Sequence, residues 1–475
     1  GDFNHWDGRR HPMHRMPMSG IFELFVPGAV PGDLYKYQIK VKGGIVTDKT
    51  DPYGTSTEMP PATASVITAN ASFEWQDGEW MNARKKFKAR KEPVSIYETS
   101  LRDWENPTQL VNYVKKLNYT HVELHPVMEY LNEEDGEFGT FAYYAPTRRF
   151  GTAEDLKTLI NELHMIGTGV FLDWTPAHFP CHEEGLENFD GTPLYENPDP
   201  SMAIHPMWGT YLYNYESPMV KDFLLANAFY WLEEFHFDGL RMDAVGNLIY
   251  WQGDSNRGEN LSALKFLKTM NQGLKERLPD VMLFAEDSTP YQGVTKAVSE
   301  GGLGFDYKWD MGWMNDTLSY FQSSPEQRKE QYHKLTFSMM YFYNEKYLLP
   351  LSHDEVVHGK ATIAQKMNGG YDGKFPQARA FYMYMYAHPG LKLNFMGNEL
   401  AQLKEWSEVG DLDWMLLDFP IHEKFHRFMK ELNHCYLEHP ALYRHDFEDK
   451  GFQWIDCHQE GRCIYVFERS SKKER

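Results

Sequence analysis

The pattern of apolar and polar positions along the chain changes near residue 94. Before that point, short apolar stretches at 21–26 and 34–39 flank the turn residues of 31–33 (PGD). Short strands separated by turn residues are typical of an all-β module. We therefore expect a small N-terminal β-sandwich over residues 1–80.

From residue 94 onward, the pattern alternates between strands and helices. Strand-like apolar stretches occur at 94–97, 121–124, 169–173, 239–245, 281–285, 347–351 and 391–395. Apolar stripes with helical spacing predict helices that begin near 107, 152, 217 and 261. Such alternation predicts a parallel sheet covered by helices. Seven or eight repeats favour an α/β fold, a (β/α)8 TIM barrel over 93–435, over an open doubly wound sheet. In addition, no glycine-rich phosphate-binding fingerprint follows the first strand.

Three stretches lie outside this alternation. Residues 76–92 are polar and basic around Arg84, which suits a linker. Residues 178–217 form a long connection without clear periodicity, and its tryptophan and tyrosines are a poor composition for disorder. Residues 440–475 become β-like again, and the chain ends soon after two short strands. We interpret them as a truncated C-terminal all-β domain.

Composition and charge narrow the choice of partners. The chain has 475 residues, and its 48 basic and 68 acidic side chains give a net charge of −20. This charge makes nucleic acid and anionic membrane poor partners. Aromatic residues make up 15%, which suits either a large core or flat faces that stack on sugars. The 4 cysteines include no Cys-x-x-Cys pair, and no apolar run reaches the roughly 18–20 residues of a membrane span, so we expect a cytoplasmic protein.

Acids, histidines and one arginine gather at the carboxyl-terminal ends of predicted strands. They are Asp173, His178, Arg241, Asp243, Glu286, Asp287, His353, Asp354 and Glu355. In a barrel this is the end where active sites lie, and charges there are costly unless they are paired. Each has a structural alternative, namely a loop cap, an ion pair, a hydrogen-bonded core histidine or a solvated turn. Their joint occurrence at four strand ends favours an active site.

Three carboxylates with arginine and histidine, and without cysteine, suit two kinds of chemistry. One is glycosyl transfer by a carboxylate pair. The other is metal-assisted hydrolysis with histidine and aspartate ligands. The His-x-His spacing of metal sites is absent from the sequence, and the aromatic connection favours a sugar. We expect neither a metal nor another cofactor.

Four segments resemble, in order, the four signature regions of the α-amylase superfamily. They are 171–178 (FLDWTPAH), 239–245 (GLRMDAV), 284–288 (FAEDS) and 351–355 (LSHDE). Six more are similar to one family of that superfamily, the glycogen (1,4-α-glucan) branching enzymes: 1–8 (GDFNHWDG), 144–151 (YAPTRRFG), 189–196 (FDGTPLYE), 307–313 (YKWDMGW), 353–360 (HDEVVHGK) and 394–399 (NFMGNE). The resemblance covers nearly the whole chain. It implies a catalytic barrel preceded by the trailing part of a glycogen-binding sandwich module.

The resemblance also implies a retaining reaction on an α-1,4 glucan. Asp243 would be the nucleophile, Glu286 the general acid/base, and Asp354 the carboxylate that holds the distorted sugar. The cleaved chain would pass to a glucan 6-hydroxyl. The carboxyl groups of Asp243 and Glu286 are then expected about 5 to 5.5 Å apart.

Four further residues would bind the substrate or support the acids. Arg241 would orient Asp243 and keep it ionised. His178 and His353 would hydrogen-bond sugar hydroxyls, and Asp173 would support the site. Glu286 must stay protonated near neutral pH, which requires an apolar or like-charged setting.

The implied partner is an α-glucan, such as glycogen or an amylose-like chain, bound by a monomer. Three alternatives remain open: a hydrolytic or debranching relative, a non-catalytic glucan-binding relative, and a metal-dependent hydrolase. One segment departs from the branching-enzyme pattern, since 138–141 (FGTF) lacks the family's Gly-Tyr-Gln, whose tyrosine stacks on the sugar. Either Tyr143 or Phe141 replaces that tyrosine, the loop is shorter, or the sequence is defective there.

Overall fold

The computed structural model of the chain describes residues 1–69, 72–132, 136–407 and 410–471. The chain divides into two compact units, each built from three segments. The first, here the N-terminal unit, comprises Gly1–Glu74, Pro126–Thr158 and Thr175–Phe235. The second, here the barrel unit, comprises Trp75–His125, Leu159–Trp174 and His236–Arg475.

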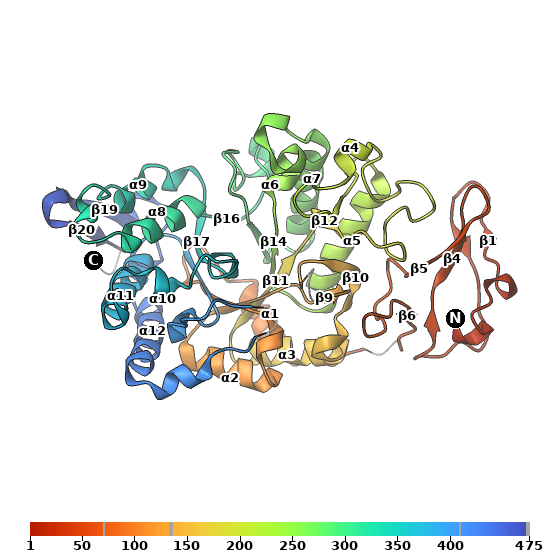
Figure 1. Cartoon of the computed structure of the whole chain (residues 1–475), viewed down its shortest axis with the longest axis horizontal. Coiled ribbons are helices and arrows are strands. Elements are labelled where there is room, and N and C mark those ends of the chain that lie inside the picture. The colour runs from red at the N-terminus through yellow and green to blue at the C-terminus, as the bar shows by residue number, and fades with distance from the viewer. Residues whose placement is uncertain (70–71, 133–135, 408–409, 472–475) are drawn as a thin grey trace. The chain divides into compact units, whose positions relative to one another are not determined.

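Eight parallel strands close into a barrel within the barrel unit (Figure 1). They are β7 (Ser95–Thr99), β8 (His121–Leu124), β11 (Gly169–Trp174), β14 (Gly239–Met242), β15 (Met282–Ala285), β16 (Tyr307–Trp309), β17 (Tyr347–Leu351) and β18 (Leu391–Phe395). Each strand pairs with the next in the chain, and β18 pairs with β7. The predicted (β/α)8 barrel is confirmed. Strand β16 was not predicted, because three residues are too few to show a period.

The barrel unit also contains most of the long helices. The helices outside the N-terminal unit are α1 (Gly78–Arg84), α2 (Pro107–Leu117), α6 (Gly246–Ile249), α7 (Leu261–Arg277), α8 (Met311–Gln322), α9 (Lys334–Phe337), α10 (Ile363–Lys366), α11 (Tyr371–Ala387) and α12 (Pro420–Glu438), while α3 spans Ala153–Met165. Helix α2 shows why they form where they do. The Asn106 side chain accepts a hydrogen bond from the Gln109 amide, Pro107 occupies the first turn, and Asn118 ends the helix in the left-handed conformation (φ 62°).

Helix α1 corrects the interpretation of residues 76–92 as a linker. Its last residue, Arg84, is buried and pairs with Asp238 and Asp280. The Trp80 indole also donates to Asp238. The basic run suggested a solvated segment, but its first member reaches the amino-terminal ends of β14 and β15.

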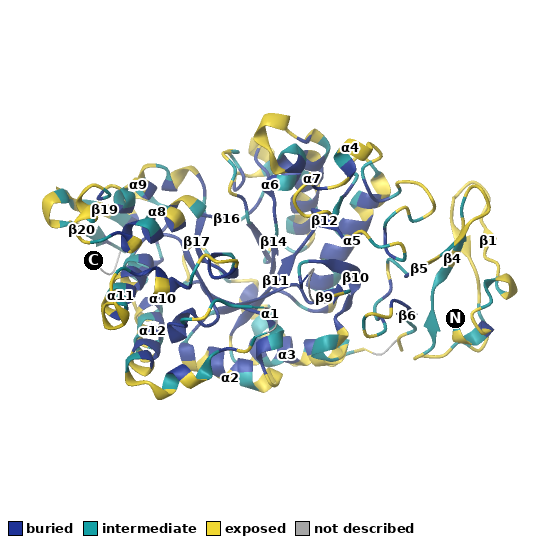
Figure 2. Ribbon diagram, viewed as in Figure 1, coloured by how far each residue is buried: buried dark blue, intermediate teal, exposed yellow. Residues whose placement is uncertain are grey.

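The inside of the barrel has two layers, which follow from the alternation of side chains along each strand. Apolar residues form the layer nearer the strand starts, including Ile96, Phe171, Phe284 and Tyr307. Two residues further along the same strands stand Glu98, Asp173 and Glu286, with Trp309 on the fourth. All barrel strands are buried, as Figure 2 shows in dark blue. The strands therefore carry a polar layer at their carboxyl-terminal ends, above an apolar one.

The N-terminal unit consists of short antiparallel pairs and two helices. Its strands are β1 (His14–Arg15), β2 (Phe22–Glu23), β3 (Leu34–Tyr35), β4 (Tyr37–Lys40), β5 (Val46–Lys49), β6 (Ser65–Val66), β9 (Met128–Tyr130), β10 (Thr140–Pro146), β12 (His178–Phe179) and β13 (Tyr211–Leu212), and its helices are α4 (Pro200–Ala203) and α5 (Pro218–Glu234). The pairs are β1 with β2, β3 with β6, β4 with β5, β9 with β10, and β12 with β13. The connection 178–217 is ordered by its own contacts, since the Tyr215 hydroxyl donates to the carbonyl of Pro176 at 2.7 Å.

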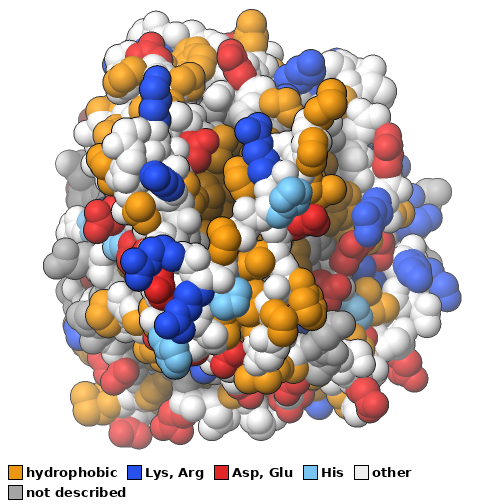
Figure 3. Space-filling view, turned by 90° about the vertical axis from the view of Figure 1, so that its right-hand side faces the viewer, with side chains coloured by type: hydrophobic (Ala, Val, Ile, Leu, Met, Phe, Trp, Pro, Cys, Tyr) orange, Lys and Arg blue, Asp and Glu red, His pale blue; other side chains and the backbone are white. Residues whose placement is uncertain are grey.

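The described part of residues 440–475 contains the antiparallel hairpin of β19 (Phe452–Gln459) and β20 (Ile464–Arg469). Among the described helices, none is long and apolar enough to cross a membrane. On the face drawn in Figure 3, basic, acidic and apolar side chains are interspersed. The excess of acidic residues therefore does not make that face uniformly acidic.

Candidate active site

The polar layer of the barrel brings together six of the seven predicted site residues. We use the name site cluster for Glu98, Glu123, His125, Asp173, Arg241, Asp243, Glu286, His353 and Asp354, which all belong to the barrel unit. The three predicted catalytic acids, Asp243, Glu286 and Asp354, are partly exposed, whereas the other members are buried. The acids that face solvent are therefore held by a buried polar layer.

Arg241 is the centre of this layer. Its Nη1 donates to Asp173 Oδ1 at 2.7 Å and to Asp243 Oδ1 at 2.7 Å. Its guanidinium lies 4.4 Å from the ring centre of Trp309. Arg241 and Asp173 are fully buried, while the Asp243 side chain is 18% exposed. The arrangement fixes Asp243 Oδ1, while part of the Asp243 side chain stays exposed to solvent.

Glu286 is tied to the turn that follows Asp243. The Ala244 amide donates to Glu286 Oε2 at 2.8 Å, and the Val245 amide donates to the Glu286 carbonyl at 2.9 Å. Burial raises the pKa of Glu286 to about 7; Arg241 opposes this shift, and the charges of Asp243 and Asp354 add to it. The side chain is thus largely protonated below neutral pH, as a general acid requires.

Asp354 lies in the 3-10 turn η11 (His353–Glu355), directly after β17. Its Oδ1 is 3.4 Å from His353 Nε2, and its side chain is 45% exposed. Burial opposes its ionisation, but the charges of His353 and Arg241 lower the pKa of Asp354 below its usual value. Asp354 is therefore ionised at neutral pH, where Glu286 is only partly ionised.

Asp173 and Glu123 are buried acids of this layer whose ionised forms are unfavourable. Burial raises the pKa of Asp173 to about 7, although Arg241 opposes the shift. Burial also raises the pKa of Glu123 well above its usual range, and the charges of Asp173 and Glu98 add to this effect. Arg241 is the one arginine of the site cluster and lies near several of its acids, so the cluster has more acidic groups than its arginine can neutralise.

The residue after Glu286 is structural. The Asp287 carboxylate is buried and lies 2.8 Å from Lys308 Nζ, and it accepts a hydrogen bond from the Thr289 amide at 2.9 Å. The alternative of a solvated turn at Glu286 and Asp287 is therefore wrong. Lys308, on β16, anchors the loop that carries Glu286.

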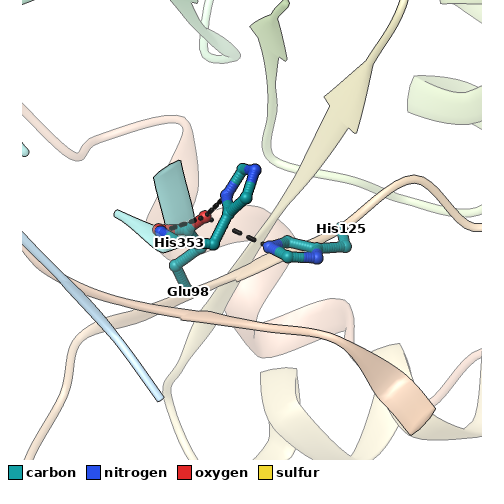
Figure 4. A group of neighbouring side chains, drawn as sticks. All are labelled: Glu98, His125 and His353. Atoms are coloured by element: carbon teal, nitrogen blue, oxygen red, sulfur yellow. Dashed lines mark hydrogen bonds and ion pairs between the residues drawn. The ribbon is translucent and has the colours of Figure 1, made fainter. Parts of the chain in front are cut away.

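Sequence reasoning missed three members of the site cluster: Glu98, Glu123 and His125. Glu98 accepts from the imidazoles of His125 and His353, as Figure 4 shows. Residues 121, 123 and 125 alternate along β8 and its extension, so all three share the inward face. Strand alternation continued past the end of each predicted strand would have found Glu98 and His125.

Glu98, His125 and His353 are also the described residues whose positions would suit a metal ion. Their ligand atoms all lie within 4.8 Å of one another. However, the carboxylate already bonds both imidazoles, at 3.1 Å from His125 Nε2 and 2.5 Å from His353 Nδ1. We assign them as a hydrogen-bonded chain, and the expectation that no metal is needed stays a prediction.

His178, the seventh predicted site residue, belongs to the N-terminal unit. It is buried beside Trp208, at 4.9 Å between ring centres. Tyr143 and Phe141, the two replacements considered for the missing stacking tyrosine, are also buried in this unit. The Tyr143 hydroxyl donates to the His178 carbonyl at 2.6 Å. In this structure neither side chain offers an open face for a sugar.

Two family models match parts of the chain. The model for carbohydrate-binding module 48 (isoamylase N-terminal domain) matches residues 1–54. The model for the alpha amylase catalytic domain matches residues 73–189. These matches agree with the expected module and barrel.

Curated relatives are similar over essentially the whole chain. A protein named 1,4-alpha-glucan branching enzyme GlgB from Cellvibrio japonicus is 44% identical over 100% of this chain and 67% of its own length. The protein of that name from Marinobacter nauticus is 42% identical over 99% of this chain and 78% of its own length. Others are covered less far, such as that from Frankia casuarinae, at 46% identity over 60% of its length. The chain thus spans roughly two thirds of the length of the relatives it matches.

Solved structures support the fold alone, because their identity to this chain is low. The pullulanase type I of Bacillus subtilis, solved with maltose, has a TM-score of 0.71 at 18% identity and covers 94% of this chain and 69% of its own. A pullulanase from Anoxybacillus, solved with maltotetraose, has a TM-score of 0.69 at 17% identity, over 94% of this chain and 74% of its own.

Proposed function

The chain belongs to the family of 1,4-alpha-glucan branching enzymes GlgB, and from this premise we propose that it cleaves α-1,4 bonds of a glucan and transfers the released chain to a 6-hydroxyl. The product is an α-1,6 branch. The observation that carries the chemistry is the site cluster itself. Its Asp243 is paired with a buried arginine, and its Glu286 has a pKa raised by burial to about 7.

In the first step, an oxygen of Asp243 attacks the anomeric carbon of the donor sugar. The bond from that carbon to the glycosidic oxygen breaks, and Glu286 gives its proton to that oxygen. The result is a covalent glycosyl-enzyme and a free chain end. Arg241 holds Asp243 in place, which suits a nucleophile.

In the second step, the acceptor's 6-hydroxyl attacks the same carbon and gives its proton to Glu286. The bond to Asp243 breaks, and two inversions restore the α configuration. Asp354 stays ionised and stabilises the positive charge that develops on the sugar ring in both steps. His353 and His178 contact sugar hydroxyls, and Asp173 supports Arg241. The separation of about 5 to 5.5 Å between the Asp243 and Glu286 carboxyl groups stays a prediction.

Branching differs from hydrolysis only in its acceptor, so the assay must separate the two. Amylose is incubated with the protein, and three quantities are followed: iodine colour, reducing ends, and chain lengths after debranching. We expect the iodine colour to fall and short chains to appear on debranching, with almost no gain in reducing ends. A steady rise in reducing ends would show a hydrolytic or debranching relative instead.

The matched control is Asp243→Asn, which keeps the size of the side chain and removes the nucleophile. Branching by this variant at the parent's rate would show that the nucleophile is wrongly assigned. No change of amylose by either protein would support a non-catalytic glucan-binding relative. Loss of activity in chelator would support the metal-dependent hydrolase. The monomeric state and the cytoplasmic location expected from the sequence also stay predictions.

A further inference from the structure

Glu98 is a buried carboxylate for which the proposed reaction has no use. It lies in β7 and is 0% exposed. Its Oε1 is 2.5 Å from His353 Nδ1 and 3.1 Å from His125 Nε2. The backbone amide of His353 also donates to both of its oxygens, at 3.4 and 3.3 Å. A buried carboxylate is costly unless its partners are well placed, so these bonds hold it in one position.

Glu98 binds one residue through both its main chain and its side chain. That residue, His353, begins η11, and the next residue in this turn is Asp354. With Nδ1 committed to Glu98, His353 can face Asp354 only through Nε2, which is 3.4 Å from Asp354 Oδ1. Figure 4 shows dashed lines from Glu98 to both imidazoles. The position of Asp354 therefore depends on a carboxylate that lies two strands away in the barrel sheet, from β17 through β18 to β7.

We propose that Glu98 is a positioning residue, which fixes the orientation and the charge of His353 and through it the place of Asp354 beside the sugar. This inference rests on the proposed function and deepens it. Glu98 itself touches no reacting atom. A merely structural carboxylate would stabilise the fold without setting the charge of His353.

The groups around His353 favour an ion pair between His353 and Glu98. Asp354, Glu98 and His125 are the titratable groups whose charges act most strongly on its imidazole, and Phe395 and Trp406 contribute apolar rings. Burial opposes its protonation, and so does His125, but Asp354 and Glu98 raise the pKa of His353 above its usual value. Burial likewise opposes the ionisation of Glu98, yet His353 and His125 lower its pKa to about 2. Glu98 is thus an anion that favours the cationic form of His353.

The test is Glu98→Gln, which keeps the shape and removes the charge. We expect kcat to fall at least about tenfold, in the range seen when partners of active-site histidines are removed, while KM changes less. The alkaline limb of the pH–rate profile should move to lower pH. In proteins with 15N-labelled histidine, the His353 ring, assigned by its loss in His353→Asn, should lose its proton at a lower pH than in the parent.

Glu399→Gln is the matched control. Glu399 is another fully buried carboxyl at a strand end, but it accepts from the hydroxyls of Tyr97 and Tyr113 and has no contact with His353 among the described residues. It should leave kcat and the His353 titration unchanged, even if the free energy of unfolding falls. Glu98→Asp keeps the charge, so it should restore the parent's pH profile.

An unchanged His353 titration in Glu98→Gln would overturn the proposal. If that variant does not fold, a Glu98→Asp protein whose His353 titration or pH profile departs from the parent's would overturn it as well. The titration needs no substrate. It therefore decides the role of Glu98 even if the parent protein fails to branch amylose, which would count against the proposed function alone.

Discussion

Both ends of the barrel carry a buried cluster of charged side chains, but the two clusters differ in how many hydrogen-bond donors surround their acids. At the carboxyl-terminal end lies the site cluster. At the amino-terminal end lies a second group, here the floor cluster, whose members are Asp77, Trp80, Arg84, His164, His236, Asp238 and Asp280. Both lie in the barrel unit, and both combine carboxylates with arginine and histidine.

In the floor cluster, the acids are surrounded by donors. Asp238 accepts from the Trp80 indole at 2.9 Å, from Arg84 at 3.1 Å, from His164 at 3.0 Å, and from the Val170 amide at 2.7 Å. Burial opposes its ionisation, but His164 and Arg84 lower the pKa of Asp238 strongly. The acids here are stabilised as anions.

In the site cluster, the acids outnumber their donors. Both Glu123 oxygens and Asp173 Oδ2 are buried without a hydrogen-bond partner among the described residues. Accordingly, the pKa values of Asp173, Glu123 and Glu286 are raised, whereas the pKa values of Asp77 and Asp238 at the floor are lowered. At the amino-terminal end, the donors stabilise ionised acids and therefore the fold. At the carboxyl-terminal end, the acids with too few donors have raised pKa values, which weakens the fold but provides a protonated acid for catalysis.

The largest expected effect comes from Glu286→Gln, which removes the general acid. We expect kcat to fall about a thousandfold. The parent's activity should decline as pH rises through about 7, because Glu286 loses its proton there, and the variant should lack this part of the alkaline limb and keep the part due to His353. Thermal unfolding at pH 8 should also show a higher Tm, since the raised pKa means that ionisation of Glu286 destabilises the folded state. A variant with parental kcat, or with a lower Tm at pH 8, would contradict the contrast between the two ends.

Asp238→Asn should show the reverse pattern. Removing one partner of a buried ion pair leaves Arg84 with Asp280 alone and His164 with Asp77 alone, so we expect the free energy of unfolding to fall by about 3 to 5 kcal/mol. The kcat of the folded fraction should stay at the parent's value, because the substitution lies at the far end of the strands. Chemical denaturation and amylose assays of the same preparation measure both. A fall in kcat of fully folded Asp238→Asn protein would show that the floor cluster influences the site cluster.

Part of this picture was predictable from the sequence. The barrel was predictable because seven of its strands carry apolar runs. Strands β8, β17 and β18 begin and end where the pattern predicts. The candidate acids were also predictable, because residues at strand ends meet at one end of a barrel. Asp243 and Arg241 stand two apart on one strand and do share a face, joined at 2.7 Å.

The rest depends on long-range contacts that no local pattern reveals. Arg84 stands in a run of basic residues and was interpreted as part of a linker, yet its partners Asp238 and Asp280 follow more than 150 residues later. Glu98 was missed for the same reason, because His353 is 255 residues away. The chemistry of a buried charge depends on its partner, and only the folded chain identifies the partner.

A smaller effect is expected in the pH dependence of stability, because the floor cluster contains an acid with a lowered pKa and a histidine with a raised pKa. Burial opposes the ionisation of Asp77, yet hydrogen bonds from His164 and His236 lower its pKa. Its contribution is therefore complete above the unfolded value near 3.8 and is lost as pH falls through the lower folded value. Conversely, Asp238 and Asp77 outweigh burial and raise the pKa of His164, so its contribution is complete below the unfolded value of 6.5 and is lost as pH rises through the folded value.

The measurement is Tm against pH for the parent and for Asp77→Asn. We expect the parent to be most stable between these limits, at mildly acidic pH as far as this cluster is concerned. In the variant, the loss of Tm on acidification below pH 4 should be smaller, and so should the loss above neutral pH. Parallel curves for the two proteins would show that Asp77 does not differ in proton affinity between the folded and unfolded states.

The smallest effect is expected from Trp80→Phe, which removes one donor to Asp238 and keeps an aromatic ring against His164. Because Asp238 retains three other donors, the free energy of unfolding should fall by only about 1 kcal/mol, the usual net worth of one hydrogen bond. The same substitution made in Asp238→Asn should cost less, since the two residues are in contact and their effects should not add. If the two losses simply add, Trp80 stabilises the floor by packing alone, and the dense donor shell of Asp238 is not what separates this end of the barrel from the other.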